Sequence, residues 1–381
     1  VGTMRAPNET DLTQYQSGPL EALCDELARY VGAPAAANIL VTPGSDDALR
    51  AAIDTSTLRG HTSVVAGTPG YTHFEHYCKL KPLRMIQYAI GLATAPASHA
   101  ASLRYYAAEL QAGCLVYLCS PNNPTGDLWS PNTVAGFAAA YPRSLFLVDE
   151  AYVEFAAADL PRAMLETETV SNTSDAYVKL NSKSCVSIAA DFDNVVVTRT
   201  FSKAFGLAAQ RVGYAVGSPK LIAELGVAVS PKAFGPMACE LALAVLRSAD
   251  YYWYAALNLK LNEGQVVDAL RYAGWVIYAT PGNYFLLYAG PGGAAGSLTA
   301  TLASKGIAIR DRDSLPGLAG FVRITSGNSD DSAALLVAFS TITPPASAPP
   351  QALFTEKSRV AAIKSLMRLS LAVLEESKLV V

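Results

Sequence analysis

The segment VVVTRTFSKAFGLAAQRVGYAVG, residues 195–217, places a polar turn between two apolar runs. The β-branched run VVVTRT (195–200) and the run VGYAVG (212–217) are typical of buried strands. Runs of the same kind occur at residues 114–119 and 144–149, and helical patterns separate several of these runs. Continuous apolar strands that alternate with helices predict an α/β fold, in which helices cover both faces of a mostly parallel sheet.

The sequence divides into four predicted regions. The α/β pattern occupies residues 19–249, a large domain, and residues 1–18 precede it as an N-terminal arm. The long proline-free pattern at 250–273 predicts one helix that opens a smaller α+β domain over residues 250–342, with strands in WVIYA, NYFLLYA, GIAIR and FVRIT. Residues 343–381 combine a proline-rich linker with an amphipathic helical pattern.

Composition and charge indicate a compact globular protein. Of the 381 residues, 51% are hydrophobic, which excludes intrinsic disorder. The net charge is −3, with 29 basic and 32 acidic residues and no long run of like charge, so we expect no nucleic-acid partner. No stretch approaches the roughly 18 consecutive apolar residues that a membrane helix needs, and we therefore expect no membrane span.

The cysteines and histidines lack the spacing of a structural site. The six cysteines include no C-x-x-C pair, which argues against a disulfide framework or a zinc ribbon and is typical of a reducing compartment. The four histidines show no metal-ligand spacing with cysteines or acids, so no metal is expected. Because the N-terminus also lacks the charged-then-apolar layout of a secretory signal, we expect a cytoplasmic protein.

Lys203, in the turn after the strand 195–200, is the predicted reactive residue. At the exit of a buried strand its amine is expected to be desolvated, which lowers its pKa and frees it to form a Schiff base with an aldehyde. Thr200, Ser202 and Arg211 add two hydroxyls and a guanidinium, the complement of a phosphate monoester. The pattern favours pyridoxal 5′-phosphate as cofactor; the alternative is a solvated lysine that caps a strand.

Asp149 follows an apolar strand, at the end where ligands of open α/β sheets bind. A carboxylate buried there needs a partner, and a pyridinium nitrogen is one that an ionised Asp149 would keep protonated. Tyr152 and Asn123, the latter in SPNNPTG (120–126), are placed to bond the phenolic oxygen of the same ring. A plain Asn-Pro turn is the alternative for the second motif.

Two more segments complete the predicted site. In TPGSDDALR, residues 42–50, a glycine turn leads into a helix start, whose free backbone N–H groups bind anions. In PGYTHF, Tyr71 is placed either to stack on a pyridine ring or to pack in the core as an ordinary aromatic.

The combination GSDDAL, PGY, SPNNPTG, VDEAY, TRTFSKAFGLAAQRVGY and GIAIRDRDSLPGLAGFVRITSG resembles the fold-type I pyridoxal-phosphate aminotransferases, class I/II, and most closely the histidinol-phosphate aminotransferase branch. The similarity runs from about Tyr15 to about Phe339. It implies the PLP-transferase fold type I, and a homodimer that moves an amino group between an amino acid or a histidinol phosphate-like amine and a 2-oxo compound.

The resemblance also implies roles at the cofactor ring. Lys203 forms the Schiff base and then shuttles the proton between the substrate carbon and the cofactor. Asp149 pairs with the ring nitrogen, Asn123 and Tyr152 bond the ring oxygen, and Tyr71 stacks on the ring.

Other matching positions bind anions. The phosphate is held by the backbone amides of Ser45 and Asp46 and by Ser202 and Arg211, with Thr200 nearby. Tyr15 matches a tyrosine that reaches the phosphate of the neighbouring subunit. Arg323 matches the arginine that receives the anionic group of the substrate, and Arg310 matches a second arginine used by phosphate-bearing substrates.

Two departures from the family pattern leave alternatives open. Only PNETDL (7–12) stands where an Asn-Glu-Asn-Pro-aromatic-Gly element usually covers the substrate, so histidinol phosphate, an aromatic amino acid and a less common phospho-amine all remain. Residues 156–191 form a surface excursion that lengthens the spacing from Asp149 to Lys203. A pyridoxal-phosphate-dependent decarboxylase of a phosphorylated amino acid shares these motifs and stays the alternative activity.

Overall fold

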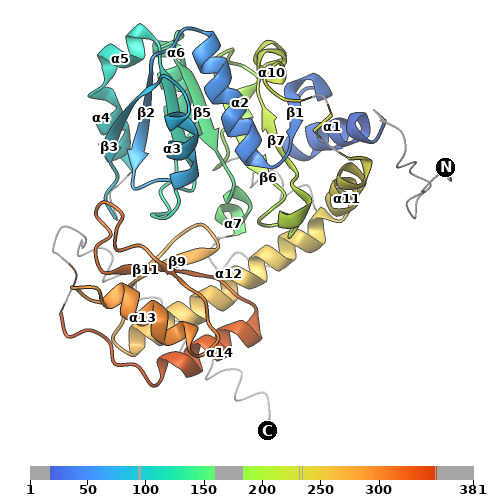
Figure 1. Ribbon diagram of the computed structural model, residues 1–381. Helices are drawn as coiled ribbons and strands as arrows, with labels where there is room; N and C mark the ends of the chain where they lie inside the picture. The colour runs from blue at the N-terminus through green and yellow to red at the C-terminus, as the bar shows by residue number, and fades with distance from the viewer. Residues whose placement is uncertain are drawn as a thin grey trace. The chain divides into compact units, whose positions relative to one another are not determined.

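The computed structural model describes residues 18–92, 96–158, 183–230, 232–233, 235–347 and 349 (Figure 1). The chain forms two compact units. Of the described residues, unit 1 holds those within 18–90, 96–261 and 279–284, and unit 2 holds those within 91–92, 262–278 and 285–349. The division falls inside helix α12 (Ala249–Tyr272), between Leu261 and Asn262.

Unit 1 alternates strands with helices along the chain. Its strands are β1 (Ile39–Thr42), β2 (Ser63–Thr68), β3 (Arg84–Ala89), β4 (Leu115–Cys119), β5 (Leu145–Asp149), β6 (Val195–Thr200) and β7 (Gly213–Val216). Its helices, besides the first part of α12, are α1 (Gly18–Val31), η1 (Ala36–Asn38), α2 (Ser45–Leu58), α3 (Thr72–Lys79), α4 (Pro96–Arg104), α5 (Ala107–Ala112), α6 (Pro131–Ala140), α7 (Val153–Ala158), α9 (Val186–Ala189), η3 (Ala208–Gln210), α10 (Pro219–Gly226) and α11 (Pro236–Arg247).

The seven strands of unit 1 form one sheet in the order β1-β7-β6-β5-β4-β2-β3. Strand β7 is antiparallel to both of its neighbours, and the other neighbouring pairs are parallel. The connection from β6 to β7 holds only the short helix η3, and a parallel return would need a longer crossover, usually with a full helix. The mostly parallel sheet expected from the sequence is therefore confirmed.

The central strands are buried on both faces, which explains their continuous apolar sequence. In β4, Val116 and Leu118 pack in one core cluster, while Leu115 and Tyr117 pack in another cluster on the opposite face. Helix α2, which packs against β5, β6 and β7, covers part of the second face (Figure 1).

A buried ion pair joins β6 to the residue that follows β5. Arg199 Nε lies 3.0 Å from Glu150 Oε2, and the two side chains are 0% and 1% exposed. The Ser184 hydroxyl donates to the same Glu150 oxygen over 2.6 Å, and the Cys185 N–H donates to the other oxygen over 2.6 Å. These contacts pin residues 184 and 185 of the predicted excursion to the sheet; residues 159–182 of that excursion lie outside the described part of the chain.

Unit 2 is built on the second part of α12. Its strands are β8 (Val276–Ala279), β9 (Tyr284–Tyr288), β10 (Arg310–Asp311) and β11 (Phe321–Thr325), in the sheet order β10-β11-β9-β8, and its helices are α13 (Ala294–Ala303) and α14 (Ser329–Phe339). Leu287, Val322 and Ile324 are buried in its core with Leu302 of α13. The smaller α+β fold expected from the sequence is present in this unit.

The strand predicted for GIAIR is wrong for all but its last residue, because β10 begins only at Arg310. The Ile307 N–H donates over 2.9 Å to the carbonyl of Leu302 at the end of α13, and Gly306 has a φ of 79°. The backbone of Gly306 and Ile307 thus caps the C-terminal end of α13, so the Ile307 N–H cannot also pair with a neighbouring strand. The amphipathic helix predicted after residue 350 lies outside the described residues.

Replacing Arg199 with methionine should lower the free energy of unfolding by about 3–5 kcal/mol, because Glu150 then stays buried without a counter-charge. Urea unfolding followed by circular dichroism measures the loss. The matched control is Lys220→Met, which breaks the exposed 3.2 Å pair with Asp193 and should cost less than about 1 kcal/mol. Equal losses in the two variants would contradict a structural role for the buried pair.

Candidate functional site

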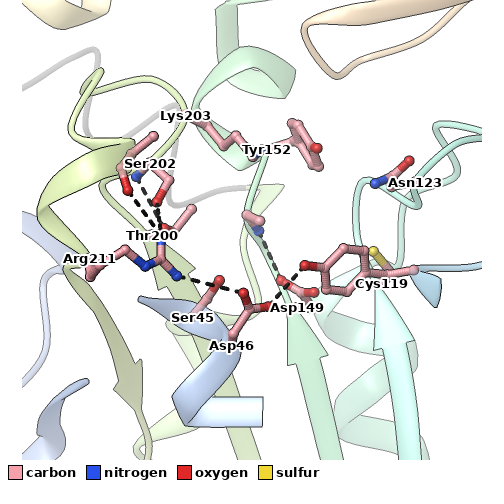
Figure 2. Close-up of a pocket in the computed structure, with 13 residues that line it drawn as sticks. Ser45, Asp46, Cys119, Asn123, Asp149, Tyr152, Thr200, Ser202, Lys203 and Arg211 are labelled. Carbon is pink, nitrogen blue, oxygen red and sulfur yellow. Dashed lines mark hydrogen bonds and ion pairs between the residues drawn. The ribbon is translucent and has the colours of Figure 1, made fainter. Parts of the chain in front are cut away.

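A pocket opens in unit 1 at the carboxyl ends of β4, β5 and β6 (Figure 2). Its volume of about 180 Å³ is several times that of a water molecule, so it suits a small organic ligand. Its lining includes every cofactor-site residue predicted from the sequence within the described chain, and adds Cys119, Ala151 and Ala208: Ser45, Asp46, Tyr71, Cys119, Asn123, Asp149, Ala151, Tyr152, Thr200, Ser202, Lys203, Ala208 and Arg211.

Asp149 is the last residue of β5 and is 4% exposed. The Tyr117 hydroxyl donates to its Oδ2 over 2.8 Å, and the Ala151 N–H donates to its Oδ1 over 3.2 Å. Burial raises the pKa of Asp149 to about 6, while these two donors oppose the rise and the carboxylates of Asp46 and Glu150 add to it. A cation bound against Asp149 would lower this pKa, so the carboxyl suits a protonated ring nitrogen.

The end of the pocket that suits an anion lies where α2 begins. The N-cap of α2 is Gly44, with a φ of 77°, so the free N–H groups of the first turn have no side-chain cap. A Cβ at Gly44 would lie 2.5 Å from Arg211 Nη2, and a Cβ at Gly213 would lie 2.3 Å from the Ser45 nitrogen. Gly44 therefore permits the close approach of the guanidinium to the helix start, and Gly213 permits the close approach of β7 to the same backbone. The guanidinium and the helix start together suit an anion.

Arg211 adopts a left-handed backbone conformation with a φ of 53°. Such a conformation costs an L-residue about 1–2 kcal/mol. It places Arg211 Nη1 3.5 Å from the Ser202 hydroxyl and 3.0 Å from the Ala208 carbonyl, so the guanidinium is held on the Ser202 side of the pocket (Figure 2). Thr200 supports the same turn, because its hydroxyl accepts the Ser202 N–H over 3.1 Å.

The side chain of Asp46 has contacts that sequence reasoning did not anticipate. Its Oδ2 lies 3.7 Å from Arg211 Nη2, and its Oδ1 accepts the Tyr71 hydroxyl over 2.9 Å. The same hydroxyl lies 3.0 Å from His73 Nδ1. Desolvation and the Asp46 carboxylate both raise the pKa of Tyr71, which therefore remains a neutral donor. Tyr71 lines the pocket and also packs against a core cluster of unit 1, so its stacking on a cofactor ring stays a prediction.

Lys203 lies in the turn after β6 and is exposed, so the desolvation expected from its place at a strand exit is wrong. The strand ends at Thr200, and two residues separate it from Lys203, which lies at the rim of the pocket. Its Nζ lies 5.3 Å from the centroid of the Tyr152 ring, which attracts a cation through its π-face. Figure 2 shows Lys203 and Tyr152 side by side, with Asn123 and Cys119 across the pocket.

Tyr152 is positioned by aromatic packing. Its ring meets that of Tyr284 edge-on, with centroids 5.2 Å apart, and the Tyr284 hydroxyl donates over 2.7 Å to the carbonyl of Asn122. Asn122 precedes Asn123 in the turn after β4. Tyr284 therefore packs against Tyr152 and also holds the turn that carries Asn123, the other residue predicted to bond the ring oxygen. The sequence patterns did not point to Tyr284.

The predicted substrate arginines lie in unit 2, where they form a pair. Arg310 of β10 and Arg323 of β11 are direct cross-strand partners, so their side chains lie on one face of the sheet. Val322 and Ile324 beside Arg323 are buried in the core of the unit, as their alternation predicts. Tyr15 lies outside the described residues.

The pocket in unit 1 suits pyridoxal 5′-phosphate at three points. Arg211, Ser202 and the uncapped start of α2 suit the phosphate; the buried Asp149 carboxyl suits the ring nitrogen; and Lys203 presents an amine for the aldehyde. Among the described residues, no group of three or more His, Cys, Asp or Glu side chains is arranged to hold a metal ion, and no helix is long and apolar enough to cross a membrane.

Comparisons with known proteins agree with this geometry. The sequence matches the family described as aminotransferase class I and II over residues 4–339. A histidinol-phosphate aminotransferase of Burkholderia lata is 30% identical over 330 residues, which cover 86% of this chain and 83% of that protein.

Solved structures share the fold. The histidinol-phosphate aminotransferase of Sinorhizobium meliloti, in complex with pyridoxal-5′-phosphate, matches with a TM-score of 0.69 and 24% identity over 86% of this chain and 82% of that one. The L-threonine-O-3-phosphate decarboxylase of Porphyromonas gingivalis matches with a TM-score of 0.63 and 21% identity over 87% and 93%. The decarboxylase therefore shares the fold alone, and favours no second activity here.

The family match covers most of the chain and confirms the resemblance drawn from the motifs, including the aminotransferase activity and the cofactor. The chain belongs to the aminotransferase class I and II family and has the fold of the type I pyridoxal-phosphate enzymes.

Proposed function

We propose that this aminotransferase takes a phosphate-bearing amine of the histidinol phosphate type as amino donor and a 2-oxo acid as acceptor. The observation that supports this substrate class most directly is the cross-strand pairing of Arg310 with Arg323. The pairing places two guanidinium groups on one face of the sheet, and a doubly charged phosphate is the ligand that two such groups complement. The similarity to a histidinol-phosphate aminotransferase of 30% identity supports the same substrate class.

When bound, pyridoxal 5′-phosphate supplies an aldehyde that receives the amino group and a ring that accepts electrons. Arg211, Ser202 and the first-turn N–H groups of α2 hold its phosphate, which orients the ring. Asp149 holds a proton at the ring nitrogen. The Lys203 amine would hold the cofactor through its aldehyde carbon, with the aldehyde oxygen leaving as water, and would move a proton at the reacting carbon once it is released.

The remaining ring contacts complete the proposed site. Asn123 and Tyr152 lie at the pocket wall and bond the ring oxygen, and the Tyr71 ring stacks on the pyridine face. The hydrogen bond from Tyr71 to Asp46 supports this role, because it fixes the hydroxyl end of the ring beside the anion-binding helix start.

We also propose that the protein is a homodimer, as the family resemblance implies. Helix α12 supports this assembly, because Tyr251, Tyr254 and Leu261 are 69%, 49% and 38% exposed and recur at helical spacing along one side. Exposed apolar rows of this kind mark interfaces. Tyr15 would complete the phosphate site of the neighbouring subunit. The cytoplasmic location expected from the sequence stays a prediction.

Borohydride treatment of the cofactor-loaded protein should fix the cofactor to the peptide that contains Lys203, as peptide mass spectrometry would detect. Lys203→Ala should lose both this adduct and the visible absorption band of the protein. The control is Lys220→Ala, an exposed lysine that pairs with Asp193 and should keep both signals. An unmodified Lys203 peptide from protein that retains the cofactor would contradict the role of this lysine.

Arg323→Ala should lower kcat/KM for every amino donor by roughly 30-fold or more, because losing a desolvated charged contact costs about 2–5 kcal/mol and each decade corresponds to about 1.4 kcal/mol. Arg310→Ala should affect histidinol phosphate more than histidinol. Steady-state kinetics with both donors measures the difference, and the exposed Lys305→Ala of unit 2 is the control. Equal losses at Arg310 for the two donors would favour an unphosphorylated aromatic substrate.

Sedimentation of the wild-type protein should give the mass of two chains. The double variant Tyr251→Asp/Tyr254→Asp should shift the protein to monomer, because two charges would be buried in the proposed interface. Tyr105→Asp, which alters another tyrosine that is 85% exposed, should leave the dimer intact. A wild-type monomer that holds the cofactor tightly would rule out the shared site.

A further inference from the structure

Tyr117 lies outside the pocket but is hydrogen-bonded to a residue that lines it, Asp149. It lies in β4, is 3% exposed, and does not line the pocket. Its hydroxyl donates to Asp149 Oδ2 over 2.8 Å. The family motifs quoted above do not include this residue, since SPNNPTG begins three positions after it.

The Tyr117 ring is held in place by stacking. The ring of Phe74, a fully buried residue of α3, lies parallel to it with centroids 3.7 Å apart and an interplanar angle of 10°. On the neighbouring strand, the cross-strand partner of Tyr117 is Leu147, two residues before Asp149. Because residues two apart on a strand share a face, the phenol reaches the carboxylate along the sheet surface. The hydroxyl therefore has a fixed direction toward Asp149.

A neutral phenol that donates to a carboxyl oxygen favours the ionised carboxylate over the acid. Tyr117 remains neutral, since desolvation and the nearby Asp149 raise its pKa well above the ordinary value for tyrosine. The Ala151 N–H donates to the other oxygen of Asp149. These two donors oppose the effect of burial on Asp149, and Tyr117 is the stronger of the two.

We propose that Tyr117 is a positioning residue for the cofactor, because its hydroxyl keeps the Asp149 carboxylate ionised and oriented toward the ring nitrogen. This inference rests on the proposed role of Asp149 in cofactor binding. The other titratable groups whose charge acts on Asp149 or responds to it are Asp46 of α2, Glu150 after β5, Tyr71 before α3 and Cys119 of β4. A substitution of Tyr117 by phenylalanine leaves all of these side chains in place, but it also removes the hydrogen bond between the Tyr117 hydroxyl and the Cys119 thiol.

Tyr117→Phe removes one oxygen and keeps the ring that stacks on Phe74. Asp149 should then ionise about one to two pH units higher than in the wild-type protein, the shift that corresponds to losing a hydrogen bond to a charged group. The affinity for pyridoxal 5′-phosphate should fall about two- to tenfold at pH 7 and change little at pH 9, where the carboxyl is ionised in both proteins.

The experiment is a spectrophotometric titration of the full-length apoprotein with pyridoxal 5′-phosphate between pH 5.5 and 9. The cofactor phosphate titrates in the same way in all variants. A difference between a variant and the wild type in the pH dependence of the affinity therefore reports the ionisation of Asp149. Tyr88→Phe is the matched control, because Tyr88 is a buried tyrosine of the same sheet on the opposite face from Tyr117. Tyr88→Phe should leave unchanged the midpoint, the pH at which the cofactor affinity is half of its maximum.

The outcomes separate this inference from the proposed function. Asp149→Asn that binds as tightly as wild type would overturn the role of Asp149 itself. If Asp149→Asn weakens binding while Tyr117→Phe leaves the midpoint unchanged, only the role of Tyr117 fails. Phe74→Leu, which keeps the hydroxyl but removes its stacking partner, should give a smaller upward shift than Tyr117→Phe. An unchanged midpoint in Tyr117→Phe overturns the proposal whatever Phe74→Leu does.

Discussion

The parallel alignment of β4, β5 and β6 is the constraint on which the candidate site depends. Cys119, the last residue of β4, is the register partner of Asp149, and Asp149 in turn is the partner of Thr198. Three loops therefore leave the sheet at the same edge and bring together side chains that lie far apart along the chain. The buried pair of Arg199 with Glu150 reinforces this alignment directly behind the pocket, because its members adjoin Thr200 and Asp149.

The site separates two kinds of charge. The helix start of α2 and the Arg211 guanidinium suit an anion, whereas the buried carboxyl of Asp149 suits a cation. A ligand that carries both charges is held at two points, which fixes its orientation relative to Lys203. Asp46 is the exception, since its carboxylate stands at the anion-binding end beside Arg211. The partly exposed 3.7 Å pair that it forms with Arg211 is weak, so it leaves the guanidinium available to a phosphate.

Arginines that would select the substrate belong to unit 2, while the pocket belongs to unit 1. The pairing of β10 with β11 brings Arg310 and Arg323 together despite the loop between them. Selection of the substrate and chemistry on the cofactor are thus assigned to separate parts of the chain. With the roles proposed above, the anion that the two arginines bind could change without any change at Lys203 or Asp149.

The alternation of buried strands and helices, the fold class and most pocket residues could be predicted from the sequence, because apolar periodicity and turn residues act locally. The sequence did not determine the exposure of Lys203, the use of Ile307 to close α13, or the contact of Tyr117 with Asp149. Those features depend on where each strand ends and on which side chains face one another across neighbouring strands. Only the tertiary structure decides such contacts, because they join residues with no local relation in the chain.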